Sequence, residues 1–326
     1  MKRRELLIGT VTSLPIVIGS MARPTAAAAD RPPRLGLLAF GSLGQPPLSF
    51  LVEELAAHGY VDGRTITIEH PSLAGGYQTM QALAVDLTRS QVDILVTWGT
   101  TAARAAAAVT PATPIVAVGV DPIRAGFAEN LALPGRNVTG IVVLSKALVG
   151  KRIELMREIL PGIARIGVLL GPGIERDENL RTTEAAGRAF GIEILAAPVG
   201  DPGDIDDTLA ALARRGAQGV LVAPSTMFLD YRAVIARSAT RRGLAAIFAS
   251  RAAAEAGGLV GYGPELRESF RRGAALVDKV LKGRKPSELP FEQSTKFELV
   301  INLKIARALG LDVPPMVLAR ADEVIE

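Results

Sequence analysis

The stretch that decides the fold is residues 257–264, which read Gly-Gly-Leu-Val-Gly-Tyr-Gly-Pro. Four glycines in eight residues leave this stretch without a helical period. It leads into a basic helical stretch, Leu266–Lys282, and then into residues 292–302, which read Glu-Gln-Ser-Thr-Lys-Phe-Glu-Leu-Val-Ile-Asn. The sequence closes on residues 308–315, Ala-Leu-Gly-Leu-Asp-Val-Pro-Pro, and 318–325, Leu-Ala-Arg-Ala-Asp-Glu-Val-Ile. The glycine-rich stretch therefore interrupts the regular pattern that precedes it.

Upstream of that stretch, short apolar runs alternate with amphipathic, alanine-rich runs in two successive blocks. The first block predicts strands Leu35–Phe40, Thr65–Glu69, Asp93–Trp98 and Pro114–Val120, with helices Leu48–His58, Tyr77–Arg89 and Thr100–Val109. The second predicts strands Arg165–Leu170, Ile192–Val199, Gly219–Ala223 and Ala245–Ala249, with helices Asp177–Phe190, Ile205–Arg214 and Met227–Arg241. Apolar strands that alternate with helices are typical of parallel sheets covered on both faces. We therefore predict an α/β protein with two doubly wound parallel-sheet lobes.

The length of the chain also favours two lobes, because 326 residues exceed the usual size of one hydrophobic core. Periodicity alone fits two tandem flavodoxin-like domains equally well. The order in which the chain connects the lobes therefore needs a further argument.

The C-terminal stretches quoted above closely resemble the C-terminal signature of the tryptophan/tyrosine-type ABC transporter substrate-binding proteins. The N-terminal block matches the same family over five short motifs: residues 59–63 (Gly-Tyr-Val-Asp-Gly), 66–70 (Ile-Thr-Ile-Glu-His), 99–100 (Gly-Thr), 114–116 (Pro-Ile-Val) and 134–140 (Pro-Gly-Arg-Asn-Val-Thr-Gly). The resemblance thus covers nearly the whole mature chain. It implies the type I periplasmic-binding-protein fold, in which three crossovers join the two lobes.

Three segments are the expected crossovers of that fold. The first is residues 134–141, which lie between the two blocks and precede a helix predicted over Lys146–Leu160. The second is residues 257–264, and the third, residues 286–302, returns the chain to the second lobe. The expected domains are listed here by residue range: a signal peptide, 1–29; lobe 1, 30–145 and 257–285; lobe 2, 146–256 and 286–326.

The N-terminus carries most of the positive charge. Residues 1–29 hold four basic residues and one acidic residue, which accounts for three of the four net positive charges. The remaining sequence is close to neutral, which excludes a nucleic-acid surface that follows phosphates. A cationic start, an apolar run from Leu6 to about Met21 and four alanines before Asp30 are the three parts of a secretory signal peptide. We predict cleavage near Asp30 and no stable membrane anchor afterwards, with an uncleaved anchor as the alternative.

Residue usage argues against an enzyme. The sequence has no cysteine, which excludes disulfides, thiolate catalysis and cysteine-containing zinc sites. The two histidines, His58 and His70, lack the spacing of a metal pair. No Gly-x-Ser-x-Gly elbow, Walker loop or Gly-x-Gly-x-x-Gly fingerprint follows a predicted strand. We expect no catalytic residues, no metal and no cofactor, and an unknown hydrolase is disfavoured.

Candidate ligand-binding residues lie mostly after predicted strands, because ligands of open α/β lobes bind outside the carboxyl ends of parallel strands. They are Ser42, Gln45, Trp98, Gly99, Thr100, Thr101, Asp121, Ser145, Ser225, Arg251 and Tyr262.

Three of these candidates have two interpretations each. Thr100 opens a helix, where hydroxyl and amide groups suit a ligand carboxylate or phosphate, or it only caps that helix. Asp121 suits a ligand ammonium group, or it caps the short helix that begins at the following proline. Arg251 would clamp a ligand carboxylate, or it pairs with Glu255 four residues later, and we favour the ion pair.

Two aromatic candidates complete the predicted site. Trp98, the only tryptophan, ends an apolar strand at a position where the resembling family more usually has a small residue. It either stacks on a flat ligand and narrows the pocket, or packs between lobe and helix. Tyr262 lies in the second expected crossover, where the hinge of the fold lines the cleft.

The resemblance implies an exported solute-binding protein that closes on a small molecule and delivers it to an ABC permease and its ATPase. The periplasm is the expected location, reached by the general secretory or the twin-arginine route, since Arg3-Arg4 also resembles a twin-arginine signal. Amino acids are the family precedent for the ligand. The alternatives are a periplasmic sensor for a receptor kinase and a LacI-like regulator. A signal peptide stands where such a regulator carries its DNA-binding headpiece, so we do not favour the regulator.

Overall fold

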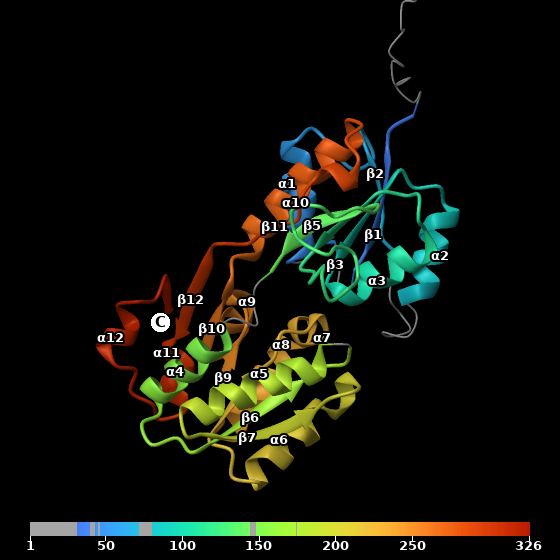
Figure 1. Ribbon diagram of the computed structural model, residues 1–326. Helices are drawn as coiled ribbons and strands as arrows, with labels where there is room; N and C mark the ends of the chain where they lie inside the picture. Colours follow the sequence, from blue (N-terminus) through green and yellow to red (C-terminus); the bar gives the residue numbers. More distant parts are fainter. Residues whose placement is uncertain (1–30, 40–42, 45, 72–79, 144–147, 174) are drawn as a thin grey trace, which may run out of the picture. The chain divides into compact units, whose positions relative to one another are not determined.

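The computed structural model describes residues 31–39, 43–44, 46–71, 80–143, 148–173 and 175–326. Residues 31–326 form one compact unit, whose regular structure consists of two helix-covered sheets (Figure 1). The expected signal peptide, residues 1–29, lies outside the described residues. No helix within the described ranges is long and apolar enough to cross a bilayer.

The first sheet has six strands in the order β11-β5-β4-β3-β1-β2, and every neighbouring pair is parallel. Its strands are β1 (Arg34–Leu38), β2 (Thr67–Glu69), β3 (Ile94–Trp98), β4 (Ile115–Val118), β5 (Val138–Val142) and β11 (Glu292–Gln293). One face packs against α1 (Leu48–Ala57) and α10 (Leu266–Leu281), and the other against α2 (Met80–Arg89) and α3 (Thr100–Val109). Val96 and Trp98 face α1 and α10 while Leu95 faces α2 and α3, because side chains alternate along a strand.

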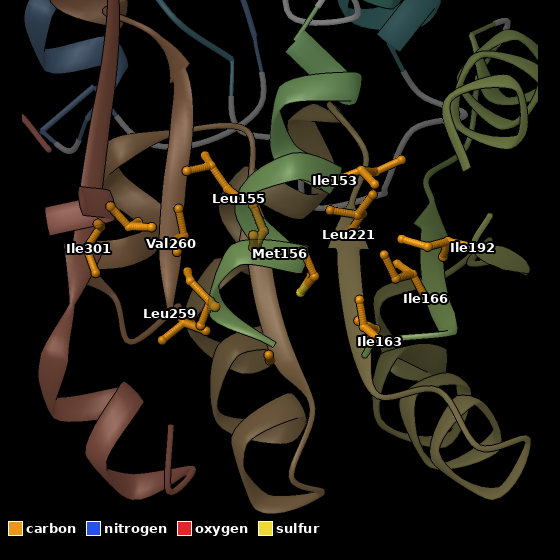
Figure 2. Packing of buried hydrophobic residues seen from close by; sticks show 14 of the residues in the cluster. Ile153, Leu155, Met156, Ile163, Ile166, Ile192, Leu221, Leu259, Val260 and Ile301 are labelled. Carbon is orange, nitrogen blue, oxygen red and sulfur yellow. The ribbon is translucent and has the colours of Figure 1, made fainter. Parts of the chain in front are cut away.

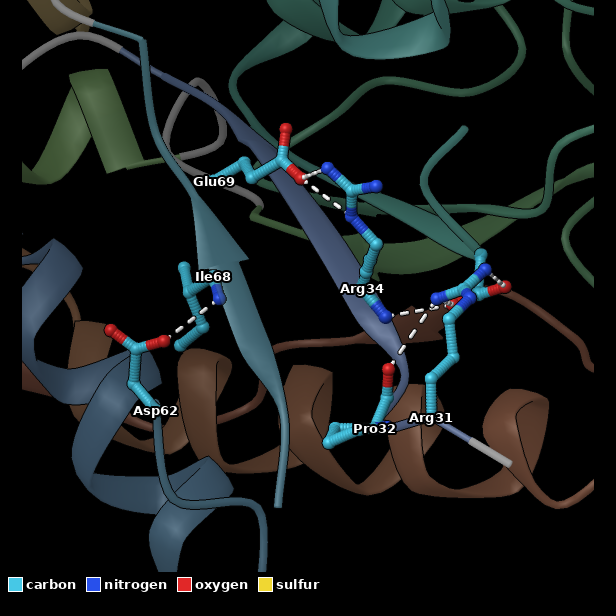
Figure 3. Close-up of polar contacts among 7 residues, drawn as sticks. Arg31, Pro32, Arg34, Asp62, Ile68 and Glu69 are labelled. Atoms are coloured by element: carbon cyan, nitrogen blue, oxygen red, sulfur yellow. Dashed lines mark hydrogen bonds and ion pairs between the residues drawn. The ribbon is translucent and has the colours of Figure 1, made fainter. Parts of the chain in front are cut away.

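Polar contacts hold the edge of this sheet in register. Arg34 Nε donates to Glu69 Oε1 at 2.8 Å and so joins β1 to β2 (Figure 3). The amide of Ile68 donates to Asp62 Oδ1 at 2.8 Å, which ties β2 to the loop before it. The amide of Arg34 also donates to Asp93 Oδ2 at 2.7 Å, immediately before β3. These contacts fix the amino ends of β1 and β3 relative to each other and join both to β2.

The second sheet has seven strands in the order β13-β12-β10-β9-β8-β6-β7. They are β6 (Arg165–Leu170), β7 (Glu193–Pro198), β8 (Gly219–Val222), β9 (Ala245–Phe248), β10 (Val260–Pro264), β12 (Phe297–Asn302) and β13 (Glu323–Ile325). The pair β10–β12 is antiparallel, and the other neighbouring pairs are parallel. Both sheets are therefore dominated by parallel pairs, as expected, and the antiparallel pair β10–β12 was not foreseen.

Helices cover both faces of the second sheet as well. The elements are α4 (Val149–Ile159), α5 (Arg176–Ala189), α6 (Ile205–Arg214), α7 (Thr226–Asp230), α8 (Arg232–Arg241), α9 (Arg251–Glu255), α11 (Leu303–Ala308), α12 (Pro315–Leu318) and two 3₁₀ turns, Pro202–Asp204 and Pro286–Glu288. On one face, Ile153 and Met156 of α4 lie over Ile166 and Leu221 of the sheet (Figure 2). On the other face, α6 and α8 pack against alternate residues of the same strands. The helix expected over 227–241 is two helices, α7 and α8.

The chain passes between the two sheets three times, after β5, after β10 and after β11, as the type I periplasmic-binding-protein fold requires. Sheet membership nevertheless differs from the expected domain ranges at two places. Residues 260–264, expected in lobe 1, form β10 of the second sheet. Residues 292–293, expected in lobe 2, form β11 of the first sheet. The second crossing thus follows the glycine-rich stretch instead of coinciding with it.

The glycines of that stretch are needed because β10 runs close to the chain that follows β9. A Cβ atom on Gly261 would come within 2.3 Å of the Ser250 carbonyl oxygen, and one on Gly263 within 1.8 Å of the Ala249 carbonyl oxygen. No side chain fits in that space, so only glycine lets the two segments lie side by side. The glycine-rich pattern of residues 257–264 predicts a connection, but residues 260–264 form a strand inside the second sheet.

Candidate functional site

A cavity of about 350 Å³ lies at the carboxyl ends of strands from both sheets. Its volume is in the range of pockets that enclose small organic ligands. From the first sheet it is lined by the residues after β3 and β4, and from the second by the residues after β6, β8 and β9. This is the edge at which the sequence places ligand-binding residues.

The segment after β3 supplies the centre of the first-sheet wall. Trp98, Gly99, Thr100 and Thr101 all line the cavity. Gly99 precedes α3 with a φ of 84°, a left-handed conformation that favours glycine. Gly99 is the N-cap residue of α3 and has no side chain with which to cap the first backbone amides of the helix.

Thr100 connects the two walls of the cavity. Its hydroxyl donates to Glu175 Oε1 at 2.9 Å, although Glu175 directly precedes α5 of the second sheet. The amide of Asp121 lies 3.5 Å from the same hydroxyl oxygen. The Thr100 side chain is almost fully buried, so this contact is shielded from solvent.

Asp121 follows β4 and lines the cavity with Pro122 and Ile123. Its Oδ1 atom accepts a hydrogen bond from the amide of Arg124 at 3.2 Å. The contact resembles the predicted cap, but residues 122–126 form a turn and not the short helix that the sequence interpretation expected. Arg124 also forms an ion pair with Glu178 of α5. The turn after β4 is therefore joined to the first turn of α5 by an ion pair. The Thr100 hydroxyl contacts both segments as well, through Asp121 and Glu175.

The second-sheet wall contributes both polar and apolar groups. Ser225, a predicted site residue, lines the cavity beside Phe228 and Leu229 of α7. Arg176 lines it as well, and its Nε atom donates to the Gly171 carbonyl oxygen at 3.1 Å. The guanidinium group is thus held against the backbone that follows β6.

Two predicted site residues lie elsewhere. Arg251 does not line the cavity; its Nε atom pairs with Glu255 Oε1 at 2.7 Å, and its guanidinium group also pairs with Glu298 and Glu323. The favoured ion-pair interpretation is confirmed. Tyr262 also lies outside the cavity lining, because its side chain packs against the core between α4 and the second sheet.

The backbone of Tyr262 meets a buried cation. Arg152 of α4 is 2% exposed, and its Nε atom donates to the Tyr262 carbonyl oxygen at 2.8 Å. Burial lowers the pKa of Arg152 to about 10, a direction that the nearby Tyr262 opposes. This contact joins the helix after the first crossing to the strand before the second.

Three further predictions, Ser42, Gln45 and Ser145, lie outside the described residues. Within the described ranges, no group of three or more acidic, histidine or cysteine side chains is placed to hold a metal ion.

Several cavity residues were missed from the sequence. Three of them lie several residues beyond a predicted strand, and the fourth comes from a strand in an unexpected sheet: Glu175, Arg176, Asn179 and Gln293. The sequence signal for the first three was the Gly-Pro-Gly run at 171–173, which ends β6 and leads into α5. Gln293 reaches the cavity because β11 belongs to the first sheet.

Comparison with known proteins gives one family and several relatives. The family model for ABC transporter substrate binding proteins matches residues 49–325. A tyrosine-binding protein from Clostridioides difficile (strain R20291) is 22% identical over 263 residues, which covers 80% of this chain and 75% of the relative.

Solved structures with the same fold include two with high similarity. A conserved domain protein from Vibrio cholerae is 25% identical, with a TM-score of 0.83 over 90% of this chain and 100% of the other. An ABC domain from Streptococcus pneumoniae, solved in complex with L-Trp, is 24% identical, with a TM-score of 0.80 over the same shares. These similarities, together with the two sheets and their three connections, establish the type I periplasmic-binding-protein fold.

Proposed function

The chain belongs to the family of ABC transporter substrate-binding proteins, and from this premise we propose that it is the extracytoplasmic solute receptor of an ABC importer. The similar proteins described above are binding proteins and not enzymes. It binds a small molecule in the cavity between the two sheets and delivers it to a membrane permease driven by an ATPase. The observation that carries the proposal is the cavity itself, which combines both sheets' carboxyl edges into one enclosure of small-molecule size.

An amino acid is the proposed ligand class. The Clostridioides difficile relative is named for tyrosine, and the Streptococcus pneumoniae structure holds L-Trp. The cavity offers both kinds of group that an amino acid needs at its polar end. The amides and hydroxyls at Thr100 and Thr101 suit a carboxylate, and the Asp121 carboxylate suits an ammonium group.

Glu175 adds a constraint to that assignment. Its carboxylate accepts the hydrogen bond that the Thr100 hydroxyl donates. A ligand carboxylate at the start of α3 therefore competes with Glu175 for that hydroxyl. Ligand binding is then coupled to the position of α5, because Glu175 directly precedes that helix.

The N-terminal sequence supports the same role. The charged start, apolar run and alanine exit of residues 1–29 form a signal peptide, and the protein acts after its removal. The two sheets with their helices are the two lobes of the mature protein, and they rotate about the three connections when ligand binds.

One preparation tests the proposal. Protein from the periplasmic fraction should show, by intact-mass measurement, the loss of about 29 residues. The same material is then screened by thermal shift against amino acids, purines and small carboxylates, where a ligand at ~100 Kd should add about 2.7 kcal/mol of stability. Full-length protein in the membrane fraction, or a screen in which no solute stabilises the protein, would contradict the proposed role.

A further inference from the structure

Trp98 is the largest side chain in the cavity lining and the only tryptophan of the chain. It is 8% exposed, so most of the indole is buried while part of it still meets the cavity. The centroid of its ring lies 5.0 Å from that of Phe270 in α10, and the two ring planes are tilted by 41°. Trp98 is thus shared between the core beneath α10 and the wall of the cavity.

The backbone of Gly119 also lies close to the indole ring. A Cβ atom at this position would lie 2.6 Å from Cζ3 of Trp98, closer than any real contact. The indole therefore occupies the volume that a side chain after β4 would otherwise fill. Gly119 also has a φ of 74°, so the backbone there already requires glycine. The indole is therefore packed close to Gly119 and in contact with Phe270.

The surroundings of Trp98 make this end of the cavity apolar. Leu229 of α7 and Leu266 of α10 pack against the same core cluster as Trp98, and both also line the cavity. The polar groups at Thr100 and Asp121 stand on the segments that follow β3 and β4. The indole of Trp98 forms the floor of this apolar end, and the apolar part of a ligand held by those groups would lie against it.

We propose that Trp98 sets the size of the ligand that this cavity accepts. The inference rests on the proposed function, because it takes the cavity as the ligand site. A smaller side chain at position 98 deepens the cavity toward Phe270 and shifts its preference to larger ligands. Trp98 is a specificity-determining residue in this sense, and its packing against α10 holds it in place.

The test compares two variants of the same core cluster. Trp98→Leu replaces the indole in the cavity lining with a smaller side chain. Phe270→Leu removes an aromatic ring from the same cluster at a position outside the cavity lining. Calorimetry with L-phenylalanine and L-tryptophan gives the ratio of the two affinities for each protein. In Trp98→Leu the ratio should shift toward L-tryptophan by about tenfold or more, the scale on which apolar pockets discriminate size. An unchanged ratio, or the same shift in Phe270→Leu, overturns the proposal.

A second probe separates this inference from the proposed ligand class. If the parent protein binds neither amino acid, the amino-acid proposal fails, and free indole then decides the role of Trp98. Indole should raise the melting temperature of Trp98→Ala and leave the parent unchanged, because the hollow left by the side chain opens on the cavity. Circular dichroism checks that the variant is folded, and Trp98→Leu replaces it if it is not. Absence of indole binding, or equal binding by Phe270→Ala, overturns the proposal.

Discussion

Asp121 combines a structural contact and a proposed binding contact in one residue. Its carboxylate accepts the amide hydrogen of Arg124, while its own amide faces the Thr100 hydroxyl. The side chain is therefore held in position at the edge of the cavity. A group that is already ordered loses little side-chain entropy when a ligand binds, so its charge-assisted contact keeps most of its strength.

Replacing Asp121 with Asn should weaken binding of the identified ligand by about 1.5–3 kcal/mol, the contribution of a hydrogen bond to a charged group. Thr100→Val should cost less, about 0.5–1.5 kcal/mol, because the backbone amides of α3 remain. Calorimetry measures both. Asp201→Asn is the matched control, since Asp201 also accepts a nearby amide, that of Gly203 at 2.8 Å, and does not line the cavity.

Equal binding by Asp121→Asn and the parent would make this assignment of the site wrong. Ser225 and Arg176, which line the opposite wall, would then be the better candidates for the polar contacts.

Position along a strand explains which cavity residues could be predicted. Thr100 and Asp121 lie two and three residues beyond the ends of β3 and β4, and residues so close to a strand end lie at the carboxyl edge of a parallel sheet. Glu175 could not be predicted in the same way, because it lies five residues beyond the end of β6. Its place depends on the direction in which α5 leaves the sheet. That direction is set by packing between segments far apart in sequence.

At the scale of elements, a single carboxylate joins α6 to α8. Asp206 of α6 accepts hydrogen bonds from Ser238 at 2.6 Å, Arg242 at 2.7 Å and Arg241 at 2.8 Å. The bonds from Ser238 and Arg242 lower the pKa of Asp206 to about 2, and nearby arginine charges add to this effect. The ionised carboxylate is therefore favoured in the folded protein.

A depressed pKa makes this contribution dependent on pH. The unfolded chain titrates near the ordinary value of about 3.9, so the stabilisation is fully present above that pH and disappears as the pH falls through about 2. Urea unfolding of the parent and of Asp206→Asn should differ most above pH ~4 and converge near pH ~2. Asp207→Asn is the control, because the carboxylate of Asp207 has no hydrogen-bond or ion-pair partner within the described part of the chain. A constant difference across this range would contradict the role assigned to Asp206.

Elements with a clear local pattern were predicted well, and elements defined by distant partners were not. The bounds of α3 and β6 agree with the predicted ranges, because a helical or apolar period is a property of the segment itself. Residues 138–141 were expected as part of a connection, yet they belong to β5 between β4 and β11. The break between α7 and α8 at Tyr231 was also missed. Strand pairing depends on partners that a local period does not report.

At the scale of the whole molecule, the first turn of α5 links the two walls of the cavity. Glu175 accepts the Thr100 hydroxyl, and Glu178 pairs with Arg124. Only the first of these pairs includes groups that line the cavity on both sides. In the proposed receptor we therefore expect the Arg124–Glu178 pair to favour closure without favouring any particular ligand. The resemblance to a known family predicted the three connections that permit closure, and periodicity alone did not.

Closure should be visible in solution. Small-angle scattering of the mature protein should show a smaller radius of gyration with saturating ligand, because the ligand favours the closed form by its differential affinity. Glu178→Gln should increase the radius of the ligand-free protein and weaken binding of all ligands alike, by about 0.2–1 kcal/mol, as for a partly exposed ion pair. Glu158→Gln is the matched control, since it removes an ion pair with Arg320 between elements of the second sheet. An unchanged radius with ligand demonstrably bound would exclude hinge closure. If Glu158→Gln had the same effect as Glu178→Gln, the loss of the Arg124 contact would not be the cause.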